Sequence, residues 1–235
     1  MNKELRDKPD LLVFDLDNTL YEYEPCNRAG EESFINYASE ILGIPRVMAR
    51  RNLARARKNV KLRVSGASSH ERSVYFSEFL VLCNALIDPR FILEADNLYW
   101  SSYLTKMELA PFSREVLAKA RLNQMSVALV TNLTSIIQYR KLVHLGIENM
   151  FDVVITSQET TGEKDTLEPF SLLSSRLRDR EINSAWFFGD TDSDFPDSYS
   201  VRSKKFFGSP FAQKSILRKD VVKLQSYKKI VKLLD

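Results

Sequence analysis

The pattern of apolar and polar positions along the chain predicts short strands that alternate with helices. Four runs of consecutive apolar residues have the length of strands that are covered on both faces, as in a parallel sheet. A fifth and weaker run follows near the end of the chain. The five predicted strands are Leu11–Phe14, Ser126–Val130, Val153–Ile155, Ala185–Phe188 and Lys204–Phe207.

Helical patterns occupy the segments between these strands. Helices are predicted over Ser113–Leu122, from about Thr134 to Leu145, and over Pro169–Arg178. The second of them is followed by Gly146, a residue type that favours the left-handed conformation found after a helix. Strands and helices that alternate at these lengths predict the α/β class, with a Rossmann-like, doubly wound parallel sheet.

One connection is much longer than the usual 2–6 residues between a strand and a helix. It joins the first strand to Ser113 and is rich in helical patterns. Residues 74–83 form an almost entirely apolar helix, and an apolar stripe recurs at helical spacing over Phe34, Ile35, Ala38, Ile41 and Leu42. We therefore predict an all-helical domain at residues 22–110, inserted into an α/β core made of residues 1–21 and 111–235.

The composition excludes several kinds of chemistry. The 235 residues include two His, two Cys and seven Gly. The two His cannot form a zinc protease helix, and Cys26 and Cys83 cannot form a cysteine-based zinc site. The glycines form neither a dinucleotide-binding motif nor a phosphate-binding loop. Catalysis is therefore expected to depend on carboxylates, hydroxyls and lysine.

Charge and hydropathy also limit the expected partners and location. The net charge of +3 is too small for a dedicated nucleic-acid or membrane protein. The charged N-terminus and the lack of a long apolar segment predict a cytoplasmic protein. The sequence carries no indication of an oligomeric state.

Residues 41–70 contain eight bases and no acid. We interpret this basic run as a solvated helix face, with attraction of an anionic substrate as the alternative. Nucleic acid is not an expected partner, because the run is not interleaved with exposed aromatic residues. The eight bases are Arg46, Arg50, Arg51, Arg55, Arg57, Lys58, Lys61 and Arg63.

Carboxylate, hydroxyl and ammonium groups occur where the predicted strands end. In open α/β sheets, ligands bind beyond the carboxyl ends of the strands. A single Asp there is often a helix cap or a turn residue. Two carboxylates at each of two strand ends repel one another unless a cation is bound, and oxygen ligands favour Mg²⁺. The residues concerned are Asp15 and Asp17, Thr131 and Asn132, Lys164, and Asp190, Asp192 and Asp194.

This set of groups predicts a reaction class. A carboxylate beside Mg²⁺, a lysine and a threonine, without a usable histidine, suits phosphoryl transfer through an aspartyl phosphate. One Asp of the first pair would attack phosphorus while the other transfers protons. We therefore expect an enzyme that transfers a phosphoryl group with the help of Mg²⁺.

Four ordered motifs in these segments resemble those of the haloacid dehalogenase superfamily of phosphohydrolases. The first motif is Asp15-Leu16-Asp17-Asn18-Thr19-Leu20, and the fourth is Gly189-Asp190-Thr191-Asp192-Ser193-Asp194. Thr131 corresponds to the second motif and Lys164 to the third. The long helical insert resembles the superfamily's C1-type cap. The resemblance extends over nearly the whole chain and implies a Mg²⁺-dependent phosphatase of a small phosphorylated metabolite, such as a sugar phosphate or a nucleotide.

The resemblance implies a role for each motif residue. Asp15 would be the nucleophile, and Asp17 would protonate the leaving oxygen and then activate water. Thr131 and Asn132 would bind the phosphoryl group, and Lys164 would neutralise it together with the nucleophile. Mg²⁺ would be bound by Asp15, the backbone carbonyl of Asp17, and Asp190, with support from Asp194. Asp192 is interpreted as a turn residue, with contact to the metal through a water molecule as the alternative.

Two features depart from the superfamily pattern, and several alternatives stay open. Asp165 follows Lys164 where the superfamily usually has Pro, and the usual Ala-Gly pair is missing after Asp194. His70 and Arg72, in the insert, are candidate substrate-binding residues if the loop that carries them faces the active site. The alternative functions are a phosphosugar mutase, a dehalogenase of the same superfamily, and a non-catalytic binding or scaffold relative.

Overall fold

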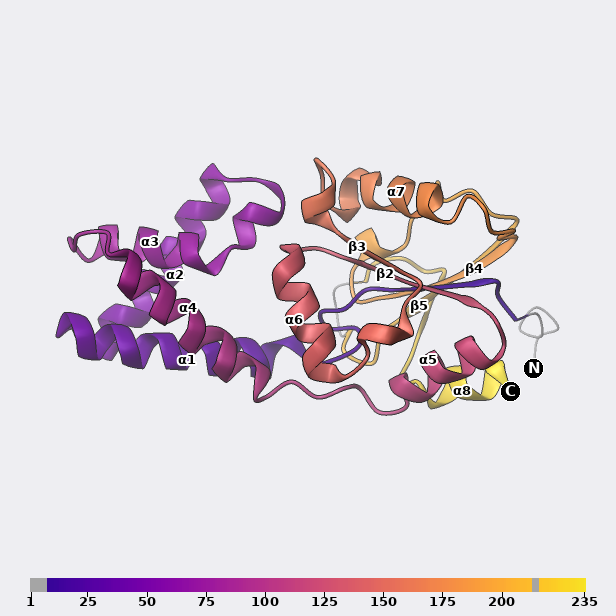
Figure 1. Cartoon of the computed structure of the whole chain (residues 1–235), viewed down its shortest axis with the longest axis horizontal. Helices are drawn as coiled ribbons and strands as arrows, with labels where there is room; N and C mark the ends of the chain where they lie inside the picture. The colour runs from indigo at the N-terminus through magenta and orange to yellow at the C-terminus, as the bar shows by residue number, and fades with distance from the viewer. Residues whose placement is uncertain (1–7, 213–215) are drawn as a thin grey trace. The chain divides into compact units, whose positions relative to one another are not determined.

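The structure, a computed structural model, describes residues 8–212 and 216–235. The chain divides into two compact units (Figure 1). The larger unit combines Met1–Glu22 with Glu108–Asp235, and the smaller is Tyr23–Met107. Most of the charged N-terminus, residues 1–7, on which the prediction of a cytoplasmic protein partly rests, lies outside the described residues. No helix of the described chain is long and apolar enough to cross a membrane.

The larger unit is built on a six-stranded parallel sheet. Its strand order is β3-β2-β1-β4-β5-β6, so the chain leaves β1 toward one side and later returns to its other side at β4. This arrangement confirms the predicted Rossmann-like sheet. The strands are β1 (Leu11–Phe14), β2 (Ser126–Thr131), β3 (Val153–Thr156), β4 (Ser184–Gly189), β5 (Ser203–Gly208) and β6 (Val221–Lys223).

The register aligns the ends of the three central strands. Phe14 at the end of β1 lies opposite Leu129 of β2 and Phe188 of β4. Because all three strands run in the same direction, the residues that follow them emerge at one edge of the sheet. This edge carries the predicted catalytic residues.

Helices cover both faces of the sheet, with α7 on one face and α5 and α8 on the other (Figure 1). Residues of β1 alternate between the faces. Val13 belongs to the core cluster with Phe170 of α7, whereas Phe14 stacks on Phe188, with ring centroids 4.4 Å apart. The helices of this unit are α5 (Ser113–Leu122), α6 (Ser135–Leu145), α7 (Glu168–Arg176) and α8 (Lys228–Leu234), with 3-10 turns at Glu148–Met150, Ser157–Glu159, Lys164–Thr166 and Asp192–Asp194.

The smaller unit is entirely helical. Its core is aromatic: the Phe34 ring stacks on Phe76 at 4.2 Å between centroids and meets Phe79 edge-on at 4.9 Å. Phe34 was predicted to be buried in an apolar stripe together with Ile41, but Ile41 is 57% exposed because it lies near the end of its helix. The helices are α1 (Tyr23–Leu42), α2 (Arg46–Arg63), α3 (Arg72–Leu82) and α4 (Pro89–Leu104), with a 3-10 turn at Gly66–His70.

The basic run forms α2 and makes ion pairs with its neighbours. Arg46 and Arg50 both pair with Glu32 of α1, and Arg63 pairs with Glu78 of α3. These arginines are more than half exposed, as expected of a solvated helix face, and each such pair contributes about 0–1 kcal/mol.

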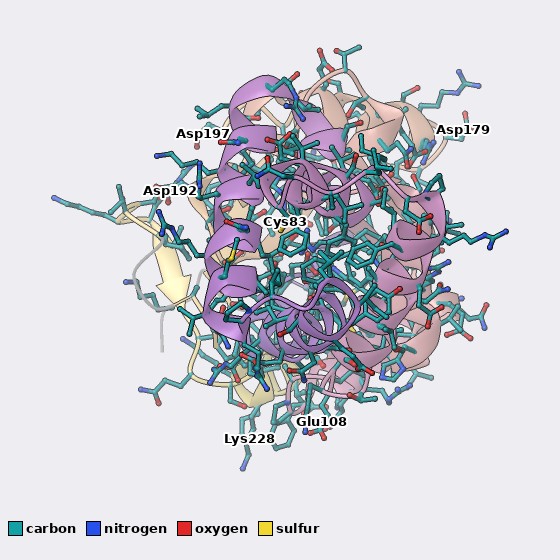
Figure 2. All side chains as sticks on the ribbon, turned by 90° about the vertical axis from the view of Figure 1, so that its left-hand side faces the viewer. Cys83, Glu108, Asp179, Asp192, Asp197 and Lys228 are labelled. Carbon is teal, nitrogen blue, oxygen red and sulfur yellow. The ribbon has the colours of Figure 1, made fainter. Side chains whose placement is uncertain are left out.

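Both cysteines of the smaller unit are free thiols. Cys26 is buried, and Cys83, labelled in Figure 2, lies with its Sγ 3.3 Å from Nδ2 of Asn52.

Candidate active site

The Asp15 carboxylate is buried directly beyond the end of β1. Its backbone amide donates to the carbonyl of Phe188 at 2.9 Å, which holds Asp15 beside β4. Lys164 Nζ donates to Oδ1 at 2.6 Å, and Thr19 Oγ1 donates to Oδ2 at 2.9 Å. The amides of Thr19 and Leu20 both donate to the carbonyl of Leu16, and this turn returns the threonine to the aspartate.

Lys164 joins two of the predicted acids. Its buried ammonium contacts Oδ1 of both Asp15 and Asp194. Burial opposes the charged form, but the two carboxylates outweigh it and raise the pKa of Lys164. The backbone amide of Lys164 donates to Oδ1 of Asn132 at 3.4 Å, so the loop after β3 is also connected to the end of β2.

Asp194 organises the loop after β4. Its Oδ2 accepts from the backbone amides of Asp190 and Thr191 at 3.0 and 2.9 Å, and from Thr191 Oγ1 at 3.0 Å. Gly189 makes this approach possible, because a Cβ there would lie 2.2 Å from Cβ of Asp194. Asp192, interpreted as a turn residue, accepts from the backbone amide of Leu217 at 3.1 Å.

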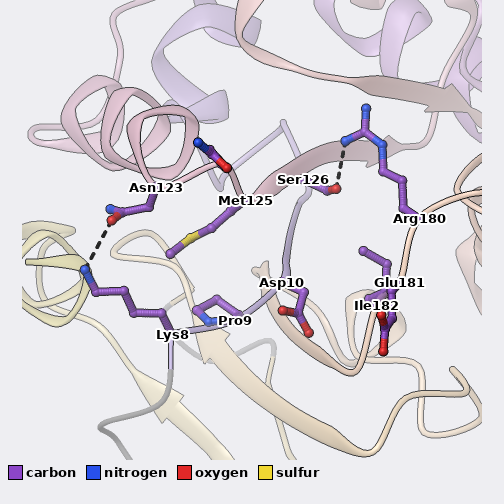
Figure 3. A pocket seen from close by; sticks show the side chains of 10 residues that line it. Lys8, Pro9, Asp10, Asn123, Met125, Ser126, Arg180, Glu181 and Ile182 are labelled. Atoms are coloured by element: carbon purple, nitrogen blue, oxygen red, sulfur yellow. Dashed lines mark hydrogen bonds between the residues drawn. The ribbon is translucent and has the colours of Figure 1, made fainter.

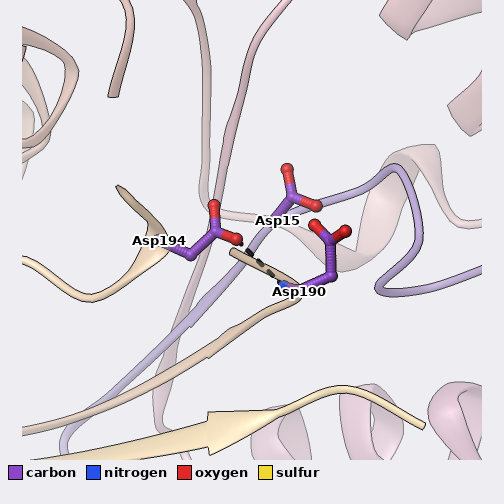
Figure 4. A group of neighbouring side chains, drawn as sticks. All are labelled: Asp15, Asp190 and Asp194. Carbon is purple, nitrogen blue, oxygen red and sulfur yellow. Dashed lines mark hydrogen bonds between the residues drawn. The ribbon is translucent and has the colours of Figure 1, made fainter. Parts of the chain in front are cut away.

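Three carboxylates converge at this edge of the sheet (Figure 4). Asp15, Asp190 and Asp194 each offer an oxygen, and these oxygens all lie within 4.8 Å of one another. Burial and the neighbouring acids raise the pKa of Asp15 to about 8, against the opposing effect of Lys164. Burial and Asp194 raise the pKa of Asp190 to about 6. Crowded oxygen donors that resist ionisation in this way fit a hard divalent cation.

The Asp17 side chain lies outside this cluster. Its Oδ1 accepts from Tyr21 Oη at 2.5 Å and from Lys141 Nζ at 2.7 Å, and Lys141 also reaches Oδ2 at 3.0 Å. The predicted metal contact of Asp17 would use its backbone carbonyl and not this side chain, and it stays a prediction. Proton transfer by the Asp17 carboxyl also stays a prediction.

Thr131 is buried at the end of β2 and is held by Gln138 of α6. Gln138 Nε2 donates to Thr131 Oγ1 at 2.6 Å and to the backbone carbonyl of Asn132 at 2.7 Å. Neither Gln138 nor Lys141 was predicted to be a site residue from the sequence. The available signal was a Gln and a Lys three residues apart on the helix face that also carries Ile137, Leu142 and Leu145, all of which are buried.

The two candidate residues of the helical unit lie beside its aromatic core. Arg72 is buried, and its guanidinium lies 5.0 Å from the ring centroid of Tyr99. It donates to the backbone carbonyl of His70 at 2.7 Å and to Tyr23 Oη at 3.0 Å. Arg72 thus fixes the turn that carries His70, and substrate contact by either residue stays a prediction.

A hollow of about 590 Å³ lies at the opposite edge of the sheet, where the strands begin (Figure 3). Its charged side chains are engaged within the protein. Lys8 donates to Asn123, Asp10 accepts from the amides of Asn183 and Ser184, and Arg180 donates to Ser126. This hollow therefore takes no part in the site around Asp15.

Comparisons with known proteins agree with this geometry. Residues 12–198 match the family model of the haloacid dehalogenase-like hydrolases. A ribulose-1,5-bisphosphate 5-phosphatase from Halopiger xanaduensis is 35% identical over 192 residues, which are 81% of this chain and 80% of that protein. The expected superfamily and the expected enzyme class, a hydrolase of phosphate monoesters, are both confirmed by these findings.

Solved structures share the fold. A HAD phosphatase from Thermococcus onnurineus matches 95% of this chain and 97% of its own, with a TM-score of 0.68 and 21% identity. The HAD-hydrolase YfnB from Bacillus subtilis, bound to magnesium, matches 97% of this chain and 100% of its own, with a TM-score of 0.66 and 15% identity. With its family motifs at the ends of the strands, this chain belongs to the haloacid dehalogenase-like hydrolases.

Proposed function

We propose that this protein hydrolyses a small phosphorylated metabolite through an aspartyl phosphate formed on Asp15, with Mg²⁺ as its metal. One observation carries the proposal. The Asp15 carboxylate is buried at the end of β1. It contacts the Lys164 ammonium and is one of three converging carboxylates. A buried, charge-compensated carboxylate at this edge of a parallel sheet suits nucleophilic attack on a phosphate ester.

The proposed reaction has two steps. A carboxylate oxygen of Asp15 attacks phosphorus, the bond to the leaving oxygen breaks, and the Asp17 carboxyl gives that oxygen its proton. The Asp17 carboxylate then takes a proton from a water molecule, which attacks phosphorus and breaks its bond to Asp15. Phosphate leaves, and both side chains return to their starting states.

The other residues bind and neutralise the phosphoryl group. Thr131 Oγ1 and Asn132 would hydrogen-bond its oxygens, and the Lys164 ammonium would offset its charge and that of Asp15. Asp15 and Asp190 would hold Mg²⁺ together with the backbone carbonyl of Asp17, and Asp194 would support them. The metal would supply positive charge that favours binding of the phosphate and ionisation of the nucleophile.

The substrate proposal is narrower than the reaction class. The Halopiger xanaduensis relative is a phosphatase of a sugar bisphosphate. At 35% identity over four-fifths of the chain, a sugar bisphosphate is the first substrate to test, followed by sugar monophosphates and nucleotides. The helical unit, as a cap, would exclude water and large substrates during the reaction.

The test is a panel of phosphate esters assayed with Mg²⁺ and with EDTA, using wild-type protein and Asp15→Asn. We expect phosphate release from at least one ester, loss of this activity in EDTA, and loss in the variant. Activity that survives both EDTA and Asp15→Asn would exclude the mechanism. Rearrangement of a phosphosugar through a bisphosphate, without net phosphate release, would identify a mutase instead.

A further inference from the structure

Lys141 is a buried cation that the proposed reaction has not yet used. It lies on α6, 124 residues from Asp17 in the chain, and its side chain is 1% exposed. Its Nζ donates to both carboxylate oxygens of Asp17, at 2.7 and 3.0 Å. The ammonium also lies 5.7 Å from the ring centroid of Tyr21, which donates to the same carboxylate.

These contacts hold Asp17 in one orientation. A short side chain that is 25% exposed would otherwise rotate toward water. Oδ1 accepts two hydrogen bonds and Oδ2 accepts one. Because a carboxylate has about four lone-pair sites, the open site on this side chain is on Oδ2. The geometry therefore favours Oδ2 as the oxygen that exchanges protons with the leaving group and with water.

Stability alone does not account for a lysine at this position. A buried ion pair is often no more stabilising than apolar side chains of similar volume. One turn earlier, the same helix face carries Gln138, which holds Thr131. The inner face of α6 thus contacts three predicted site residues, Thr131, Asn132 and Asp17.

We propose that Lys141 is a positioning residue of the phosphatase reaction, which holds the Asp17 carboxyl where it protonates the leaving oxygen. This inference rests on the proposed function and adds a residue to it. In the affected step, the bond from phosphorus to the leaving oxygen breaks while the bond to Asp15 forms, and the Asp17 proton goes to the leaving oxygen. Lys141 would act through Asp17 and would not itself contact the substrate or the metal.

The test compares two leaving groups. An alkyl phosphate has a basic leaving oxygen that needs the proton, whereas para-nitrophenyl phosphate has a stable leaving anion that scarcely needs it. For Lys141→Met we expect kcat/KM to fall about 100-fold with the alkyl substrate and less than about 3-fold with the aryl substrate. KM should change little. With the alkyl substrate, kcat/KM of Lys141→Arg should be about tenfold higher than that of Lys141→Met, because arginine restores a cationic donor.

Arg140→Met is the matched control, since it removes one positive charge from the exposed face of the same helix. It should leave both substrates unaffected. A loss in Lys141→Met that is equal for the two substrates, or no loss with either, overturns the inference. Circular dichroism and thermal melting check that the variants fold. If Lys141→Met does not fold, Lys141→Gln replaces it in the same assays.

A double-mutant cycle gives a second readout. If Lys141 acts through Asp17, adding Lys141→Met to Asp17→Asn should change kcat/KM for the alkyl phosphate by less than about 2-fold, against about 100-fold in the wild-type background. A further loss of about tenfold or more overturns the inference. A different result would contradict the proposed function. If wild-type protein hydrolyses no phosphate ester in Mg²⁺, the proposed function is wrong, and the inference about Lys141 is wrong with it.

Discussion

At the scale of single residues, the site depends on cations that offset buried acids. Lys164 serves two carboxylates, and without it Asp15 and Asp194 would face one another with no opposing charge. Removing one partner from such a group leaves an uncompensated buried charge, which costs about 3–5 kcal/mol. The same residues that perform the chemistry therefore also limit the stability of this edge of the sheet.

A glycine controls the position of Asp194. In Gly189→Ala, the new Cβ would lie 2.2 Å from Cβ and 2.4 Å from Oδ2 of Asp194, so the aspartate must shift. We expect kcat to fall about 10- to 100-fold, because Asp194 positions Lys164 and because displacements near 1 Å have effects of this size. Steady-state kinetics with the best substrate of the panel would measure the change.

Gly43→Ala is the control for backbone and stability effects. Gly43 has a φ of +62°, and a methyl group added there would have no atom within 4 Å. The substitution therefore introduces left-handed strain of about 1–2 kcal/mol without a steric clash. The Tm of the Gly43→Ala protein should fall, while its kcat stays at the wild-type value. A wild-type kcat in Gly189→Ala would show that the position of Asp194 is not critical.

At the scale of secondary structure, α1 and α4 approach closely at Gly30. A Cβ at this position would lie 2.8 Å from the Tyr99 ring. The ring is buried, and its Oη donates to Asn27 at 2.7 Å, so it has little room to move. Gly30→Ala should destabilise the helical unit by about 1–3 kcal/mol through overpacking.

Native-state hydrogen exchange distinguishes this effect from general destabilisation. Amides of α1 and α4 should lose protection in Gly30→Ala, while those of β1 and β4 keep theirs. Asn36→Ala, at an exposed position of α1, is the control and should retain wild-type protection. Equal loss of protection in the helices and the strands would contradict a local effect.

The elements that the sequence predicts correctly are those with a strong local pattern. The predicted Leu11–Phe14 and Ser113–Leu122 have the bounds of β1 and α5, because continuous apolar runs and helical periodicity are local properties. The strand β6 and the helix α8 were not predicted. Only one of the three β6 residues is buried, and α8 is a seven-residue helix with three lysines, so neither has a distinctive pattern.

The site residues also divide into those that a local pattern predicts and those that it does not. Asp15, Lys164, Asp190 and Asp194 are expected together because parallel strands deliver the residues after them to one edge. The local sequence indicates Lys141 only as a basic residue near the end of a helix. Its contact with Asp17 joins residues 124 positions apart, and a lysine on a helix is more often exposed. Local pattern carries no information on such a pairing.

At the scale of the whole molecule, the carboxylate cluster couples folding stability to pH and metal. Without metal, the pKa of Asp15 is about 8 and that of Asp190 about 6, both above the usual value near 4. Between about pH 4 and 8 the folded protein therefore binds more protons than the unfolded chain. Stability from these groups is present at low pH and is lost as pH rises through this window.

A cation at the cluster opposes this loss of stability at high pH, because it favours the ionised carboxylates and binds only the folded state. Mg²⁺ should therefore raise Tm more at about pH 8 than at about pH 5, where protons compete for the same oxygens. Thermal melts in EDTA and in Mg²⁺ at both pH values measure the difference. Asp190→Asn should remove most of the Mg²⁺ effect, and Asp220→Asn, which replaces a surface acid, should retain it. A Tm shift that is equal at the two pH values, or that persists in Asp190→Asn, would place the metal elsewhere.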